Sequence, residues 1–265
     1  MELGICIHMN ATPDEPSGVE QIPLYEKAGF DYLEAPASFL IVRPPDVRRR
    51  LEEAILASKL PCRSICNLFH PSIRLTGDSV DKGALDNYIE EAFSLASRLG
   101  VKNLVLGSGT ARNIPTHFPL EKGWDQMVDL FHRLGDRAAK DGVTIVIEHL
   151  NRLESNVIDS FEAGVAMCNQ VAHPNVRCLI DYYHLALGRE PLELMTANIG
   201  LIKHAHFANV LERSNPFADR FEAGGLQYLT ALKNAGYTGR LSVEGYSKSV
   251  DEFPRIVQFM RQHYG

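Results

Sequence analysis

The sequence lacks the features that mark several classes of protein. No apolar run approaches the ~20 residues of a membrane-spanning helix, and the N-terminal residues show no basic segment followed by a long apolar stretch. We therefore expect a cytoplasmic protein. Positive charge is not in excess either, because 27 Lys and Arg residues stand against 33 Asp and Glu residues, giving a formal net charge of −6. That balance argues against sequence-independent binding to nucleic acid or to anionic membranes.

Cysteine is scarce, and its spacing matches no metal-binding or redox motif. Two of the five cysteines, Cys62 and Cys66, lie in one apolar run, where strand alternation would put both side chains on one face. We interpret the five as buried free thiols, which are typical of a reducing compartment.

The sequence does contain a regular alternation of short β-like runs with longer helical patterns. The predicted strands are residues 3–8, 31–34, 62–68, 101–106, 143–148, 176–181, 201–207 and 240–244. The predicted helices are residues 19–28, 46–58, 84–99, 121–141, 160–170, 190–198, 226–235 and 250–263. Eight such units in 265 residues predict one (β/α)8 barrel domain spanning residues 1–265, since this fold typically takes ~250 residues. A doubly wound sheet is the main alternative, but it normally binds ligands at one or two strand ends, whereas polar residues here follow nearly every strand.

The last four predicted strands each end in a side chain that can bind a metal ion. Active sites of (β/α)8 barrels lie at these strand ends. Carboxylates favour Mg²⁺ or Mn²⁺, and an imidazole shifts the preference toward Mn²⁺, Co²⁺ or Zn²⁺. One such acid alone is often a helix cap, but four successive strand ends predict a divalent-cation site. The four residues are Glu148, Asp181, His206 and Glu244. His204, on an apolar strand, is better explained as a core residue.

Four segments in this region resemble motifs of ketose 3-epimerases of the D-tagatose/D-psicose type. These are E-x-x-N-R-L-E at residues 148–154, D-Y-Y-H at 181–184, H-A-H at 204–206 and G-Y-T-G-R-L-S-V-E at 236–244. They occur in the family's order, and the resemblance extends over the whole chain in strand order. It places the chain in the sugar phosphate isomerase/epimerase superfamily, whose members have xylose-isomerase-like barrels.

The resemblance implies roles for individual residues. Glu148, Asp181, His206 and Glu244 would hold one metal ion, commonly Mn²⁺ in the family, with Co²⁺, Mg²⁺ or Zn²⁺ as alternatives. Glu154, His184 and Arg213 would contact the substrate. Arg213 follows His206 by seven residues where the family has six, which predicts a rearranged loop. An alternative role for Glu154 is an ion pair with Arg152 or Arg112.

The implied reaction is epimerisation of a sugar carbon next to a ketone. Glu148 and Glu244, three strands apart across the barrel mouth, would alternate as base and acid around a metal-stabilised enediolate. The same site could serve an aldose–ketose or hydroxypyruvate-type isomerase, a keto-sugar lyase or a non-catalytic sugar sensor. A DNA repair enzyme of the endonuclease IV type would need additional histidine ligands that this sequence lacks.

The partners we expect are a sugar or keto-sugar and further copies of the chain, in a homodimer or tetramer, with no nucleic acid and no membrane. The segment 107–112, G-S-G-T-A-R, is interpreted as a tight turn or as a receptor for an anionic group, with Arg112 beside backbone amides. In the second case the substrate would be a sugar derivative or acid rather than a free ketose.

Overall fold

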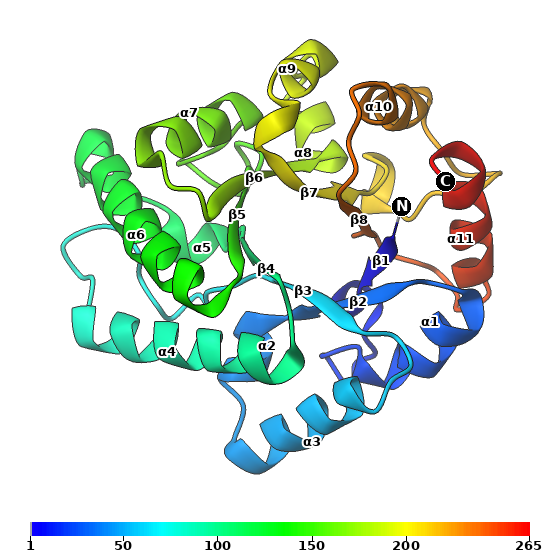
Figure 1. Cartoon of the computed structure of the whole chain (residues 1–265), viewed down its shortest axis with the longest axis horizontal. Coiled ribbons are helices and arrows are strands. Elements are labelled where there is room, and N and C mark those ends of the chain that lie inside the picture. Colours follow the sequence, from blue (N-terminus) through cyan, green and yellow to red (C-terminus); the bar gives the residue numbers. More distant parts are fainter. Residues whose placement is uncertain (1) are drawn as a thin grey trace.

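Eight parallel strands close into a barrel in chain order in the computed structural model, which describes residues 2–265 (Figure 1). Each strand pairs with the next along the chain, and the last pairs with the first. The predicted (β/α)8 architecture is confirmed. The strands are β1 (Leu3–Cys6), β2 (Tyr32–Pro36), β3 (Cys62–Cys66), β4 (Asn103–Leu106), β5 (Thr144–Glu148), β6 (Val176–Asp181), β7 (Ile202–Phe207) and β8 (Arg240–Val243).

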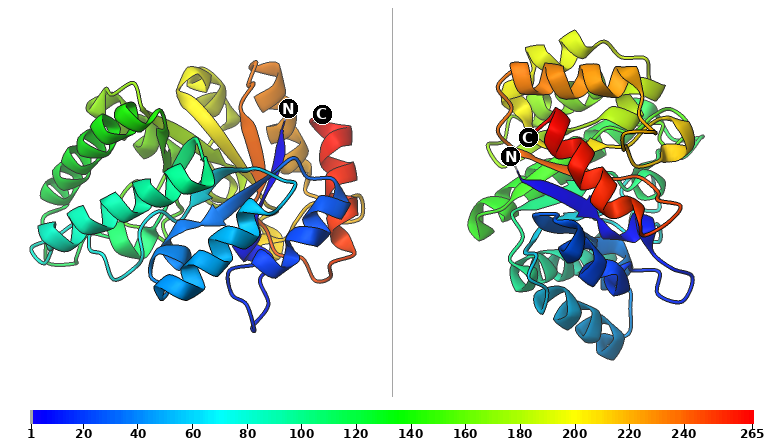
Figure 2. Two further views of the ribbon diagram at one scale, coloured as in Figure 1. Left: turned by 60° about the horizontal axis from the view of Figure 1, so that its bottom comes forward. Right: turned by 90° about the vertical axis from the view of Figure 1, so that its right-hand side faces the viewer.

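Helices surround the barrel on the outside (Figures 1 and 2). The longer ones are amphipathic and bury an apolar stripe against the strands, where each fully buried Leu, Ile or Phe contributes about 1.5–3 kcal/mol. They are α1 (Ile22–Ala28), α2 (Ala37–Ile41), α3 (Pro45–Leu56), α4 (Lys82–Leu99), α5 (Gly109–Arg112), α6 (Leu120–Asp141), α7 (Phe161–Val171), α8 (Tyr182–Leu187), α9 (Leu192–Ala197), α10 (Ala223–Asn234) and α11 (Glu252–His263), with 3₁₀ turns η1 (Ile7–Asn10), η2 (Val19–Gln21), η3 (Ile199–Leu201) and η4 (Leu211–Arg213).

The main differences from the sequence predictions lie just after the strands. The first predicted strand extends to His8, but β1 ends at Cys6 and His8 belongs to the turn η1. Three short helices, α2, α5 and α8, were not predicted. Each has six residues or fewer, which is too short to show a helical period in the sequence.

Strand alternation decides which side chains face the barrel interior. In β5, Ile145 and Ile147 pack in the large core shared with the helices, whereas Val146 packs in a small cluster inside the barrel. Because side chains alternate with a period of two, Glu148 faces the same side as Val146, at the C-terminal end of the strand. The same rule turns Asp181, His206 and Glu244 inward.

The start of β1 lies beside the C-terminal helix α11 (Figures 1 and 2). Within residues 2–265, no helix combines the length and the apolar character needed to cross a bilayer.

Candidate metal and substrate site

The structure brings the four predicted metal ligands together at the C-terminal end of the barrel. One ligand atom from each of Glu148, Asp181, His206 and Glu244 lies within 4.8 Å of all the others, and all four residues are buried. Three carboxylates and one imidazole form a ligand set that suits Mn²⁺ and related divalent cations.

His206 faces this cluster with one specific ring nitrogen. Its Nδ1 lies 3.3 Å from Glu148 Oε1 and 3.1 Å from Glu244 Oε2. The two glutamates, from β5 and β8, thus converge on one imidazole nitrogen. A cation placed among these groups would take its nitrogen ligand from Nδ1.

The buried acids also show that a positive charge fits here. Asp181 Oδ2 has no hydrogen-bond partner among the described residues, although it is buried. Burial, together with the charge of Glu244, raises the pKa of Asp181 to about 7, and burial and Glu244 also raise the pKa of Glu148. A bound divalent cation would satisfy the free oxygen and offset the repulsion among the carboxylates.

Arg213 reaches the site despite the longer loop before it. Its Nη2 lies 2.8 Å from Glu244 Oε2, and its guanidinium lies 4.6 Å from the ring centre of Tyr183. Glu212 and Arg213 both adopt left-handed backbone, with φ of 59° and 44°, so the chain kinks at the turn η4. The kinked turn lies in the loop for which the seven-residue spacing predicts a rearrangement. Burial tends to raise the pKa of Glu244, but the charges of His206 and Arg213 hold this pKa well below its usual range.

The other two predicted substrate contacts are joined by a residue that the predictions did not assign. Asn151 Nδ2 lies 2.9 Å from Glu154 Oε1 and 2.9 Å from His184 Nδ1. Asn151 therefore orients both side chains, and its place in the 148–154 motif was the signal for it. The alternative pairings of Glu154 are wrong, because Arg152 lies 3.4 Å from Asp159 and Arg112 donates to Ser155. The arginine near Glu154 is Arg213, whose Nη1 lies 4.0 Å from Glu154 Oε2.

Arg112 is a structural residue, so the part that the anion-receptor interpretation gave to its guanidinium is wrong, and residues 107–112 turn from β4 into the short helix α5. Its side chain is fully buried and donates to the carbonyl oxygens of Leu106, Glu148 and Ile158, at 3.3, 2.8 and 3.0 Å. The bond to the Glu148 carbonyl holds the end of β5 in place. Its Nε also donates to Ser155 Oγ at 3.3 Å, and the fully buried guanidinium does not line the cavity of the candidate site.

A cavity of about 510 Å³ opens above the four-residue cluster. Glu148, Glu244, Glu154, His184 and Arg213 line it. Its opposite wall is polar and comes from the ends of β1, β3 and β4, which the sequence marked only as polar strand ends. These wall residues are His8, Asn67, Ser108, Thr110 and Asn113.

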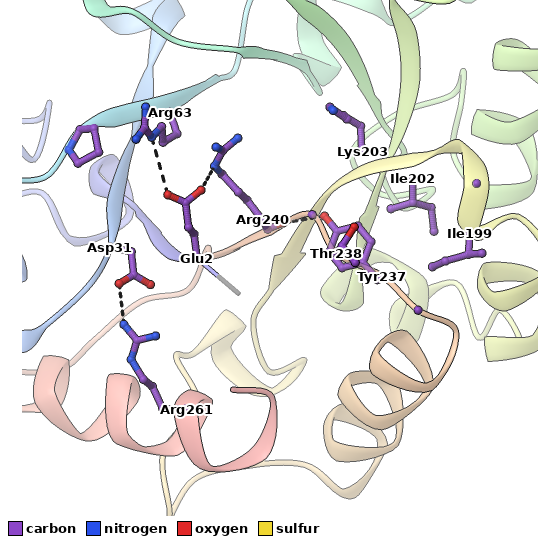
Figure 3. A pocket seen from close by; sticks show the side chains of 14 residues that line it. Glu2, Asp31, Arg63, Ile199, Ile202, Lys203, Tyr237, Thr238, Arg240 and Arg261 are labelled. Carbon is purple, nitrogen blue, oxygen red and sulfur yellow. Dashed lines mark hydrogen bonds and ion pairs between the residues drawn. The ribbon is translucent and has the colours of Figure 1, made fainter.

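A larger cavity, of about 960 Å³, lies at the N-terminal ends of the strands (Figure 3). Its acids are paired with arginines: Glu2 with Arg240 at 2.5 Å and Asp31 with Arg261 at 2.8 Å. The three groups of candidate metal ligands found within residues 2–265 all lie away from it, around His206 and Glu244. In this fold the N-terminal end serves stability, so the smaller cavity is the candidate site.

Comparison with known proteins identifies the family. The model of the xylose isomerase-like TIM barrel family matches residues 22–263, and the chain belongs to this family.

Two of its curated relatives indicate the range of activities in the family. The chain is 24% identical over 241 residues to an L-ribulose 3-epimerase from Mesorhizobium japonicum, which covers 84% of this chain and 74% of that protein. It is 30% identical over 120 residues to an inosose dehydratase from Bacillus cereus, covering 44% of this chain and 38% of that protein.

Two solved structures share the fold. The 3-keto-D-glucoside 4-epimerase YcjR from E. coli aligns with a TM-score of 0.79 at 18% identity, covering 99% of each chain. D-Psicose 3-epimerase from Clostridium cellulolyticum, solved with D-tagatose, aligns with a TM-score of 0.80 at 18% identity, covering 100% of this chain and 99% of that chain. At these identities the likeness concerns the fold.

Proposed function

We propose that the protein is a divalent-metal-dependent sugar epimerase that inverts a carbon next to a ketone, and that residues 1–265 form its single catalytic domain. The proposal rests on one observation above all, the convergence of Glu148, Asp181, His206 and Glu244 at the base of a polar cavity. The epimerase named among the relatives supports it, because the match to that protein covers most of both chains.

These four residues would hold the cation, with Mn²⁺ as the preferred ion. A cation in that place supplies Lewis acidity toward a substrate carbonyl oxygen and makes the neighbouring C–H more acidic.

The proton transfers fall to Glu148 and Glu244. Their carboxylates border the cavity from β5 and β8, so a substrate carbon above the cluster has one on either side. One carboxylate removes the proton from that carbon, and the other returns a proton to the opposite face. Arg213 would keep Glu244 oriented through its 2.8 Å contact.

Substrate orientation falls to the residues higher in the cavity. His184 and Glu154, held by Asn151, present an imidazole and a carboxylate toward sugar hydroxyls, and Arg213 closes the same side. The polar wall from β1, β3 and β4 would receive the distal hydroxyls of the sugar.

Proton exchange with solvent tests this proposal. Ketoses, keto-sugar derivatives, keto-acids and their phosphates are incubated with the Mn²⁺-loaded protein in D₂O and followed by NMR. We expect deuterium at the carbon next to the ketone, and a loss of about 10²–10⁴-fold in exchange rate for Glu148→Gln and for Glu244→Gln. Arg152→Gln, in the same loop but with its side chain 84% exposed, is the control and should retain the wild-type rate. Near wild-type exchange in either glutamine variant would contradict the two-base assignment.

A keto-sugar dehydratase is the second candidate, and the inosose dehydratase match favours it. Removal of the same proton also begins the elimination of a β-hydroxyl group as water. The same NMR experiment separates the two reactions, since elimination yields an unsaturated product and epimerisation yields an isomer of equal mass.

A further inference from the structure

Glu34 in β2 is a carboxylate buried inside the barrel, directly below the candidate metal cluster. The residue is fully buried, and its oxygens face three polar groups from β7 and β8. Oε2 lies 2.7 Å from His204 Nε2 and accepts the hydroxyl of Ser242 at 2.5 Å, while Oε1 lies 3.1 Å from His206 Nε2. A buried carboxylate is tolerated only where such donors satisfy it.

The contact with His206 bears on its other nitrogen. In a neutral imidazole, one ring nitrogen carries hydrogen and the other has the lone pair that binds a metal ion. Nε2 of His206 faces Glu34, and Nδ1 faces the oxygens of Glu148 and Glu244. The other group near Nε2 is the thiol of Cys6. Its sulfur lies 4.0 Å away, a distance too long for a strong hydrogen bond.

We propose that Glu34 is a positioning residue that accepts the Nε2 hydrogen of His206 and so directs the Nδ1 lone pair into the candidate metal site. This inference rests on the proposed function, because it assigns a role toward the cation held there. Acceptors of this kind fix the orientation and tautomer of a ligating histidine and increase its basicity.

His204 completes the arrangement. The H-A-H segment turns both imidazoles into the barrel, one layer apart, and a single carboxylate contacts Nε2 of each. His204 therefore fixes the Glu34 side chain, and Glu34 in turn fixes His206. A glutamine at position 34 would keep the shape of the side chain but would accept at one end only, so its NH₂ group would oppose one of the two imidazole N–H groups.

Mn²⁺ affinity, measured by EPR on the metal-free protein, tests the role without relying on catalysis. We expect Glu34→Gln to weaken Mn²⁺ binding by about 10–100-fold with retained folded structure by circular dichroism. Ser242→Ala is the matched control, since it removes a bond to the same carboxylate but leaves the His206 contact, and it should bind more tightly than the glutamine variant. In the Zn²⁺-loaded wild type, ¹⁵N NMR of labelled histidine should show His206 protonated at Nε2.

The outcomes separate the two claims. If the wild type does not bind Mn²⁺, the proposed function fails. If the wild type binds Mn²⁺ and Glu34→Gln binds it equally well, or if Nε2 carries no hydrogen in the Zn²⁺ form, only the role of Glu34 is refuted. Should the glutamine variant not fold, Glu34→Asp takes its place: its shorter side chain cannot reach both imidazoles, and unchanged affinity would overturn the role.

Discussion

Replacement of Gly107 by alanine should disturb the metal site while leaving the fold intact. A Cβ at this position would lie 2.1 Å from Glu148 Oε2, whereas ordinary contact begins at 3.4 Å. The Glu148 backbone cannot withdraw easily, because Arg112 donates to its carbonyl oxygen at 2.8 Å. The carboxylate itself must therefore move by roughly 1 Å or more, and a misplacement of that size in an active site can cost about 10²-fold in rate.

The effect on stability should be much smaller. Gly107 has no positive φ, so alanine fits the backbone there. The gain of about 0.4–1 kcal/mol from a stiffer unfolded chain partly offsets the local crowding, which typically costs about 1–3 kcal/mol.

Deuterium exchange into the ketose and Mn²⁺ affinity are the two assays for Gly107→Ala, with urea unfolding as the check on stability. We expect a fall of about 10²-fold in kcat/KM for exchange, together with weaker Mn²⁺ binding. Gly200→Ala is the control, because a Cβ there meets no atom within 4 Å. Wild-type exchange and wild-type Mn²⁺ affinity in Gly107→Ala would refute the position assigned to the Glu148 carboxylate.

Three further predictions concern stability. Arg112→Lys keeps the charge, but one ammonium group cannot replace all the guanidinium hydrogen bonds to Leu106, Glu148 and Ile158, so urea unfolding should show a loss of about 1–3 kcal/mol; stability equal to the wild type would contradict the structural role. Burial tends to raise the pKa of Glu52, but hydrogen bonds from Arg98 and Arg48 outweigh it and lower the pKa overall. The ionised Glu52 therefore stabilises the fold above the unfolded-state pKa of about 4.3, and this stabilisation is lost as pH falls through the lower folded-state pKa. Glu52→Gln should accordingly lower stability by about 1–3 kcal/mol at pH 7, with the difference from wild type shrinking below pH 4, and an equal difference at both pH values would contradict this pairing. Finally, Mn²⁺ at 100 times its Kd should add about 2.7 kcal/mol to the free energy of unfolding and raise Tm by about 5–10 °C, and EDTA should reverse the increase. An unchanged Tm in millimolar Mn²⁺ would count against the site.

The sequence alone was enough to predict the barrel and the side on which the site lies. Both depend on local patterns: a period of two in the strands, a period near 3.6 in the helices, and a polar residue wherever a strand ends. From these patterns Glu148, Asp181, His206 and Glu244 are predicted to face one place, and the structure puts their ligand atoms within 4.8 Å of one another.

The contacts within the site depended on tertiary structure, because they join residues far apart in the chain. Closure of the barrel brings Glu34 to His206 across 172 positions, and that contact determines which imidazole nitrogen faces the carboxylates. Arg112 shows the same limit: the sequence of its loop left a tight turn and an anion receptor open, and only packing against β5 buries the guanidinium among carbonyl oxygens. Local pattern determines the face on which a side chain lies, whereas the partner that it meets there is decided by how the distant strands close around it.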